Sequence, residues 1–310
     1  MGLLHQPMTD RIIDISENPS RLSIENQLLV IQSQGQPLYT VPVQDVAAIV
    51  ISNPGVSLTH AVISALAQAG GMLISCDHKK IPAAMVLPLS GHFVQTERFA
   101  IQAAVKAPVK KRLWQEIIQA KIRSQATVLK QLGKSHTKLK LLATKVKSGD
   151  PKNIEAWAAR LYWRSLFGAA FIRDATAIDQ NRYLNYGYAV LRAIVARALC
   201  GVGLHPSFGI KHHNRYNAFS LADDLMEPFR PIVDLVVAAQ LAKESTTSEL
   251  TRVQKQIIIN ALLQRFQLVD EARTLFDIAT KLASNLVAVM MGRQKKLMLS
   301  NLNVWPGITI

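Results

Sequence analysis

The sequence predicts an α+β protein in which a small N-terminal β-sheet domain precedes a larger all-α C-terminal domain. The chain has 310 residues, which suggests two domains at roughly 150 residues each. Short apolar runs separated by Gly, Pro and Asn fill the first ninety residues, and from about Glu97 the apolar period becomes helical. We therefore expect a β-rich dimerisation or interaction domain at 1–92 and a helical domain at 93–310.

In the N-terminal part, four segments are typical of strands: 11–16, 27–32, 46–52 and 72–76. The first alternates apolar and polar residues, and the third is an Ala/Ile/Val run that Asn53-Pro54-Gly55 ends. Between the third and fourth strands, Thr59 can cap a short helix over 61–69, which Gly70-Gly71 would close.

The C-terminal part has the spacing of helices almost throughout. We expect helical sequence over 97–147, interrupted only at Pro108, and further helices near 153–177, 183–200, 219–243, 248–266 and 269–291.

Charge and cysteine content limit the function classes. With 36 Lys and Arg against 21 Asp and Glu, the formal net charge is +15, which favours a polyanionic partner, nucleic acid before an anionic membrane surface. The two cysteines, Cys76 and Cys200, belong to no Cys/His cluster, which excludes a zinc finger or disulfide framework. We expect a cytoplasmic protein with neither a secretory signal nor a transmembrane helix.

The basic residues concentrate in residues 101–147, where twelve Lys or Arg accompany the single acidic Glu116. A solvated helix face is the simple alternative, but such faces usually intersperse Glu and Asp. Contacts to a phosphate backbone explain the imbalance better, since uncompensated cations gain by releasing counterions. Lys110, Lys111 and Arg112 are the candidates for these contacts.

Carboxylates and histidines form a second cluster over 212–231. Asp224 and Glu227 lie three residues apart, and Asp223 and Glu227 four apart, so either pair shares one helical face. The two carboxylates repel each other, and either solvent or a bound cation can relieve the repulsion. Because apolar residues surround the pair, a cation is favoured over solvent. Carboxylate oxygens with one imidazole nitrogen, from His212 or His213, suit Mg²⁺ or Mn²⁺. Two ordinary loop histidines are the alternative.

Three ordered motifs give the chain a resemblance to a known family. They are Glu155-Ala-Trp-Ala-Ala-Arg-Leu-Tyr-Trp-Arg-Ser-Leu-Phe-Gly168, Asn181-Arg-Tyr-Leu-Asn-Tyr-Gly-Tyr-Ala-Val-Leu191, and the run from His212 through Asn217-Ala-Phe to Asp224-Leu-Met-Glu-Pro-Phe-Arg-Pro231. The sequence resembles the CRISPR-associated adaptation endonucleases, the integrases that insert new spacers into CRISPR arrays, and most closely their type II branch. Its β-then-α order agrees with that family's fold.

The resemblance implies a catalytic metal site in the helical domain, built from Glu155, His212 and Glu227 with Asp224 as an auxiliary acid. Taken alone, Glu155 is more typical of a residue that stabilises a helix N-terminus through the helix dipole. Lys211 stands where family members often have the first histidine of Gly-Ile-His-His, and an ungapped count back from Glu227 selects His212 over His213. Further candidates for phosphate contacts are Arg160, Lys211, Arg215 and Arg230.

The implied reaction is divalent-metal-dependent attack on a phosphodiester: water would cleave DNA, and a DNA 3′-hydroxyl would join two strands. The implied partners are double-stranded DNA (prespacer and CRISPR repeat), a second copy of the chain, and a small ferredoxin-like CRISPR adaptation subunit. Two alternatives stay open: a metal-dependent nuclease acting on branched DNA in repair, and a non-catalytic DNA-binding scaffold of the same fold.

Overall fold

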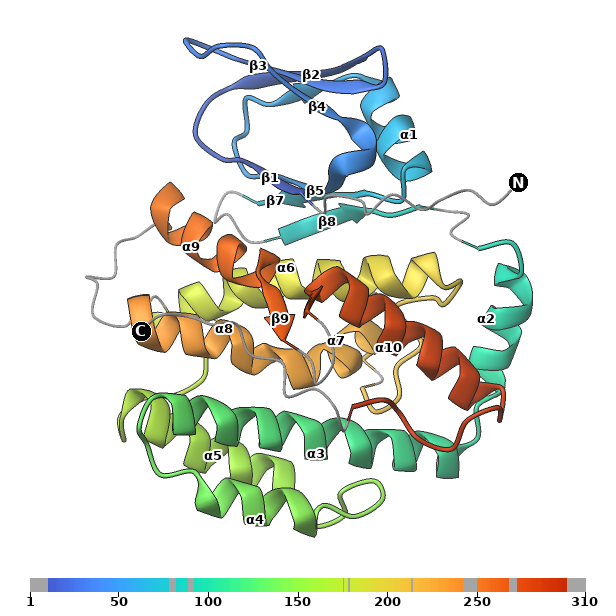
Figure 1. Ribbon diagram of the computed structural model, residues 1–310, viewed down its shortest axis with the longest axis vertical. Helices are drawn as coiled ribbons and strands as arrows, with labels where there is room; N and C mark the ends of the chain where they lie inside the picture. Colours follow the sequence, from blue (N-terminus) through green and yellow to red (C-terminus); the bar gives the residue numbers. More distant parts are fainter. Residues whose placement is uncertain are drawn as a thin grey trace. The chain divides into compact units, whose positions relative to one another are not determined.

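A computed structural model describes residues 11–77, 82–88, 92–174, 176–177, 179–212, 214–241, 250–267 and 272–299 (Figure 1). The chain separates into two compact units, residues 1–91 and residues 92–310. The first unit contains two β-sheets, and the second is mostly helical, so the predicted fold class is confirmed.

The first unit has two four-stranded sheets. One has the order β1-β5-β7-β8 and the other β4-β3-β2-β6. The strands and helices are β1 (Arg11–Ile15), β2 (Ser20–Glu25), β3 (Leu28–Ser33), β4 (Tyr39–Pro42), η1 (Val43–Asp45), β5 (Val46–Ile51), β6 (Ser57–Leu58), α1 (His60–Gln68), β7 (Met72–Cys76) and β8 (Pro82–Val86).

The core of this unit explains its strand pattern. Strand β5 pairs in parallel with β1 and β7, and its nearly continuous burial matches its unbroken apolar sequence. Helix α1 begins after Thr59, as predicted, and buries Val62 and Leu66 in the same core. The sequence reading missed β2, because only two of its residues, Leu22 and Ile24, are large and apolar.

The second unit contains more breaks than the sequence indicated. Its elements are α2 (Gln95–Ala104), α3 (Ala107–Gln131), α4 (Thr137–Lys145), α5 (Ile154–Phe167), α6 (Gln180–Gly201), α7 (Ser220–Met226), η2 (Glu227–Phe229), α8 (Arg230–Val236), η3 (Val237–Leu241), α9 (Arg252–Leu263), β9 (Arg265–Gln267), β10 (Ala272–Thr274) and α10 (Leu275–Met290).

Two of the expected helical stretches are divided by local backbone chemistry. Pro108 lies in the first turn of α3, where a missing N–H costs nothing, and Gly133, at φ +67°, follows the end of the same helix. The expected helix over 219–243 is instead α7, the 3₁₀ turn η2 around Pro228, α8 and the π-helical turn η3. Strands β9 and β10 pair antiparallel where helix was expected, so this unit is not purely helical.

Helices α3 and α6 organise the second unit. Helix α3 contacts α4, α5, α7, η2 and α8, and α6 contacts α7, α8, α9 and α10. Figure 1 shows α3, α4 and α5 as neighbouring green helices. Across the described residues, no helix is both long enough and apolar enough to cross a bilayer.

Candidate functional site

Glu155 lies in the first turn of α5. The two carboxylate oxygens of Asp150, which precedes the helix, accept hydrogen bonds from the backbone N–H groups of Ile154 and Glu155, each at 2.9 Å. The residue before the helix is Asn153, at φ +50°. This capping fixes the backbone of Glu155 while its side chain stays 25% exposed.

Glu227 reaches the same region from the 3₁₀ turn η2, where Pro228 follows it. Its side chain is only 5% exposed, and Arg230 Nε lies 3.2 Å from its Oε1. Its Oε2 is buried as well. Such an atom in a buried carboxylate is costly unless a cation faces it.

The side chain that joins the two carboxylates is Lys121, in the middle of α3. Its Nζ lies 2.7 Å from Glu155 Oε1, to which it donates a hydrogen bond, and 2.7 Å from Glu227 Oε2. Burial lowers the pKa of Lys121, but the Glu227 and Glu155 carboxylates outweigh burial and raise it above its usual value. Burial raises the pKa of Glu227, but Arg230 and Lys121 outweigh that effect and lower it. Lys121 and Glu227 thus each stabilise the charged form of the other.

His212 is held by Asp224, which is completely buried. Its Nδ1 lies 2.5 Å from Asp224 Oδ1, so Nδ1–H donates and Nε2 is the nitrogen left for another partner. The same carboxylate accepts the backbone N–H groups of Ile210 (2.6 Å) and Lys211 (2.8 Å). This hydrogen bond raises the pKa of His212. A Cβ at Gly209 would overlap the His212 carbonyl oxygen, so this loop requires glycine there.

Asp223 has a different environment from Asp224. Its Oδ1 lies 2.6 Å from Arg192 Nε, and its Oδ2 accepts a hydrogen bond from Asn217 at 2.7 Å. Both oxygens are thus occupied, and the possible pairing of Asp223 with Glu227 on one ion has no support in the structure. The other candidate histidine, His213, lies outside the described residues.

The described part of the chain contains no group of three His, Cys, Asp or Glu side chains close enough to hold an ion. The donor chemistry nevertheless fits a divalent cation, because two carboxylates from separate elements already converge on one positive charge. The carboxylate on His212 Nδ1 is the usual support of a metal-binding imidazole.

The candidate phosphate contacts fall into two groups. Lys111, Arg112, Arg160, Lys211 and Arg215 are exposed, and the Arg215 guanidinium lies over the Tyr216 ring. Lys110 and Arg230 are turned to protein groups: Lys110 Nζ is 3.4 Å from the Gly209 carbonyl, and Arg230 contacts Glu227 and the Tyr188 ring. Two of the exposed cations, Lys111 and Arg112, lie on α3. They are suited to a test of binding to the DNA phosphate backbone.

We expect replacement of Lys111 and Arg112 together by Gln to weaken binding to all DNA sequences alike. Each lost phosphate contact reduces the slope of log binding constant against log salt by about 0.9, hence by about 1.8 for both. The measurement is duplex binding by fluorescence anisotropy between 50 and 300 mM salt, with the exposed Arg21→Gln as control. An unchanged slope in a folded variant would show that these cations only solvate the surface.

A buried polar network, not predicted from the sequence, adjoins Arg230, whose guanidinium lies over the Tyr188 ring. Tyr162 on α5 donates a hydrogen bond to Asp234 Oδ2 at 2.9 Å, and Tyr188 on α6 donates to Oδ1. Burial raises the pKa of Asp234 to about 7 and, with the nearby carboxylate, the pKa values of both tyrosines well above 10. The network joins α5, α6 and α8 below the site.

This network predicts a pH-dependent stability. An unfolded Asp titrates near pH 3.9, so between about pH 4 and pH 7 the folded protein binds more protons and its free energy of unfolding falls as pH rises. Asp234→Asn keeps an acceptor for the tyrosines without this titration. We expect its melting temperature to change less between pH 5 and pH 8 than that of the wild type or the exposed Asp277→Asn. An equal pH dependence in all three proteins would contradict this origin.

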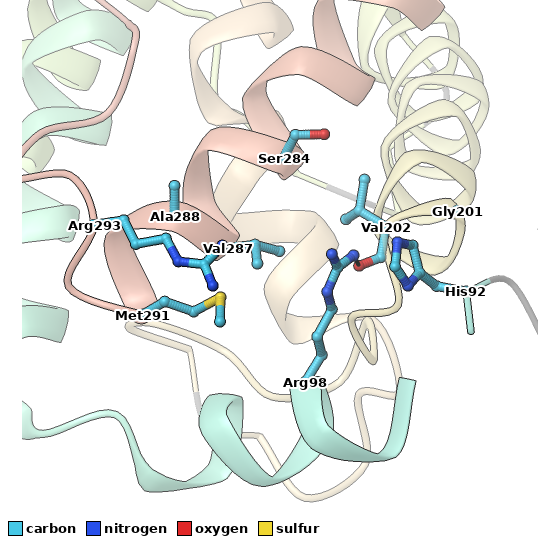
Figure 2. Close-up of a pocket in the computed structure, with 9 residues that line it drawn as sticks. All are labelled: His92, Arg98, Gly201, Val202, Ser284, Val287, Ala288, Met291 and Arg293. Carbon is cyan, nitrogen blue, oxygen red and sulfur yellow. Dashed lines mark hydrogen bonds between the residues drawn. The ribbon is translucent and has the colours of Figure 1, made fainter. Parts of the chain in front are cut away.

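Two cavities of the second unit are not lined by the candidate metal-site residues. One, of about 330 Å³, is lined by His92, Arg98, Gly201, Val202, Ser284, Val287, Ala288, Met291 and Arg293 (Figure 2). Figure 2 shows Arg98 extending from its helix toward the Val202 carbonyl, to which it donates a hydrogen bond. The other, of about 700 Å³, includes Arg112, Arg123, Lys295 and Lys296 in its lining. Neither is lined by Glu155, His212 or Glu227.

The chain is similar to proteins of a known family. The family described as CRISPR associated protein Cas1 matches residues 13–265. The CRISPR-associated endonuclease Cas1 of Neisseria meningitidis serogroup C is 41% identical over 249 residues, 79% of this chain and 81% of that protein.

Two solved structures share the fold. A casposase bound to its integration product has a TM-score of 0.76 at 20% identity and covers 93% of each chain. A chain of a Cas6-RT-Cas1–Cas2 complex has a TM-score of 0.70 at 18% identity, over 97% of this chain and 36% of that one.

Proposed function

Because this chain belongs to the Cas1 family of CRISPR-associated proteins, we propose that it is a divalent-metal-dependent DNA endonuclease and integrase, which inserts short foreign DNA segments into a CRISPR array. The observation that carries the proposal is the pair of carboxylates from α5 and η2, Glu155 and Glu227, which both lie 2.7 Å from a single ammonium. Two carboxylates that meet at one positive charge support a cation site at this point.

Glu155, Glu227 and His212 are the residues that would hold Mg²⁺ or Mn²⁺. When bound, the ion polarises the scissile phosphate and stabilises the oxygens that attack and leave. Asp224 keeps the imidazole of His212 in the tautomer with a free Nε2, and Arg230 restrains the Glu227 carboxylate. These residues position the site but take no part in bond making.

The reaction is a displacement at a repeat phosphodiester. Attack by the 3′-hydroxyl of the incoming DNA forms a new phosphodiester and releases the 3′-oxygen of the repeat strand, so the number of phosphodiester bonds is conserved. Attack by water instead breaks the bond and gives nuclease activity. The exposed cations Lys111, Arg112, Arg160, Lys211 and Arg215 would bind the DNA backbone around the site.

The proposed partners follow from the same family. One structurally similar chain comes from a complex that contains Cas2, and another is bound to an integration product. We therefore propose that this chain acts as a homodimer with a small ferredoxin-like adaptation subunit, on double-stranded prespacer and repeat DNA.

The test is joining of a labelled duplex to a supercoiled plasmid that carries the repeat, with the small subunit present. With Mn²⁺ and a 3′-hydroxyl end, we expect label to enter the plasmid; with EDTA, or with a 3′-deoxy end, we expect none. Nicking without joined product would favour a repair nuclease, and joining in EDTA would exclude the metal.

A further inference from the structure

Lys121 occupies the place in the site that a catalytic cation would need. Its ammonium contacts one oxygen of each carboxylate, Glu155 Oε1 and Glu227 Oε2, at the same distance of 2.7 Å. The lysine comes from α3, and the carboxylates come from α5 and η2, so this contact joins three separate elements. The lysine side chain is only 14% exposed.

The charged groups in direct contact here balance one another. Two carboxylates face two cations, the Lys121 ammonium and the Arg230 guanidinium, whose Nε lies 3.2 Å from Glu227 Oε1. A divalent ion added beside the ammonium would leave a strongly positive cluster, and like charges about 4 Å apart in a poorly solvated site repel strongly. Metal and ammonium therefore compete for the same oxygens.

From this geometry we propose that Lys121 is the resident counter-ion of the metal-free site, which keeps Glu155 and Glu227 together and is displaced when the divalent ion binds. The flexible four-carbon stem of lysine allows the ammonium to withdraw without a backbone change. The inference rests on the proposed function, since it requires that a metal binds this pair. It explains why two carboxylates from separate elements converge on one point.

The test uses Lys121→Met, which keeps the length of the side chain and removes its charge. In EDTA the variant leaves two carboxylates with one cation, so we expect its melting temperature to fall by several degrees. Saturating Mn²⁺ should restore it. The dissociation constant for Mn²⁺, measured by calorimetry, should be at least about tenfold lower than in the wild type. Lys130→Met, an exposed lysine of the same helix, should change neither value.

The outcomes separate this inference from the proposed function. A wild type that binds no Mn²⁺ would overturn the metal dependence itself. A wild type that binds Mn²⁺ together with a Lys121→Met variant that binds it equally or more weakly would overturn only the counter-ion role.

A second measurement uses the wild-type protein, in case the variant does not fold. We expect acetylation of Lys121 by an N-hydroxysuccinimide ester, followed by mass spectrometry and compared with Lys130, to increase several-fold when Mn²⁺ is added. Unchanged labelling with bound Mn²⁺ would mean that the ammonium stays between the carboxylates, which contradicts the inference.

Discussion

Replacing Glu155 or Glu227 with Gln is expected to reduce strand transfer and DNA cleavage by more than about 100-fold while DNA affinity changes little. Each substitution removes a negative charge that would hold the metal, and loss of a metal ligand costs more than the 10–100-fold typical of its supporting residues. We expect the affinity for DNA to depend mainly on exposed cations elsewhere. The measurement is initial rate of joining in Mn²⁺, beside duplex binding by anisotropy.

The matched control for this prediction is Glu97→Gln, an exposed carboxylate in the first turn of α2. It should retain wild-type rates. If either site variant had the wild-type rate, the carboxylate replaced in it would not be catalytic. If a variant lost DNA binding as strongly as activity, the defect would be one of folding.

The second large effect concerns the histidine pair. His212→Ala is expected to lose metal-dependent activity, because His212 is the imidazole that Asp224 orients and that packs edge-on against Trp114, with ring centres 5.5 Å apart. His213→Ala is expected to retain most of it. Rates of joining against Mn²⁺ concentration for the two variants measure the difference.

High Mn²⁺ should partly rescue His212→Ala, since a site with one ligand fewer binds the ion more weakly but keeps both charges. Rescue of the glutamate variants should be smaller because a charge is lost. An inactive His213→Ala with an active His212→Ala would show that the Lys211 departure shifts the register by one residue.

The parts of the fold that the sequence predicted are those with an unambiguous local pattern. The buried run of β5 and the Thr59-capped helix α1 follow directly from apolar sequence and turn residues. Strands β9 and β10 were missed because each is only three residues long, which is too short to show the apolar–polar alternation of a strand. The division of the expected helix over 219–243 depends on Pro228 and on packing that no local pattern encodes.

From the sequence, Glu155 and Glu227 were predicted as site residues, whereas Lys121 was counted only among the twelve basic residues of 101–147. A signal for its burial was present, because Lys121 lies four and seven residues after Ile117 and Trp114, on the apolar face of α3. A lysine on such a face is rarely buried without a partner. The partners themselves are 34 and 106 residues away in sequence, so only the packing of α3 against α5 and η2 identifies them.

The buried Tyr162–Asp234–Tyr188 network was beyond sequence reasoning for a similar reason. Asp234 lies among apolar residues of α8 and reads as a single helical acid, while its two donors belong to α5 and α6. A lone carboxylate in an apolar helix is a sign of a buried partner, but its position does not tell which hydroxyl supplies the hydrogen bond.

The most direct test of the central claim, that Glu155 and Glu227 form the metal site, is anomalous diffraction from crystals of the protein grown with MnCl₂. The account predicts one anomalous peak between the two carboxylates, with Lys121 Nζ withdrawn from both. A peak at another place, with the ammonium of Lys121 still 2.7 Å from Glu155 and Glu227, would contradict it.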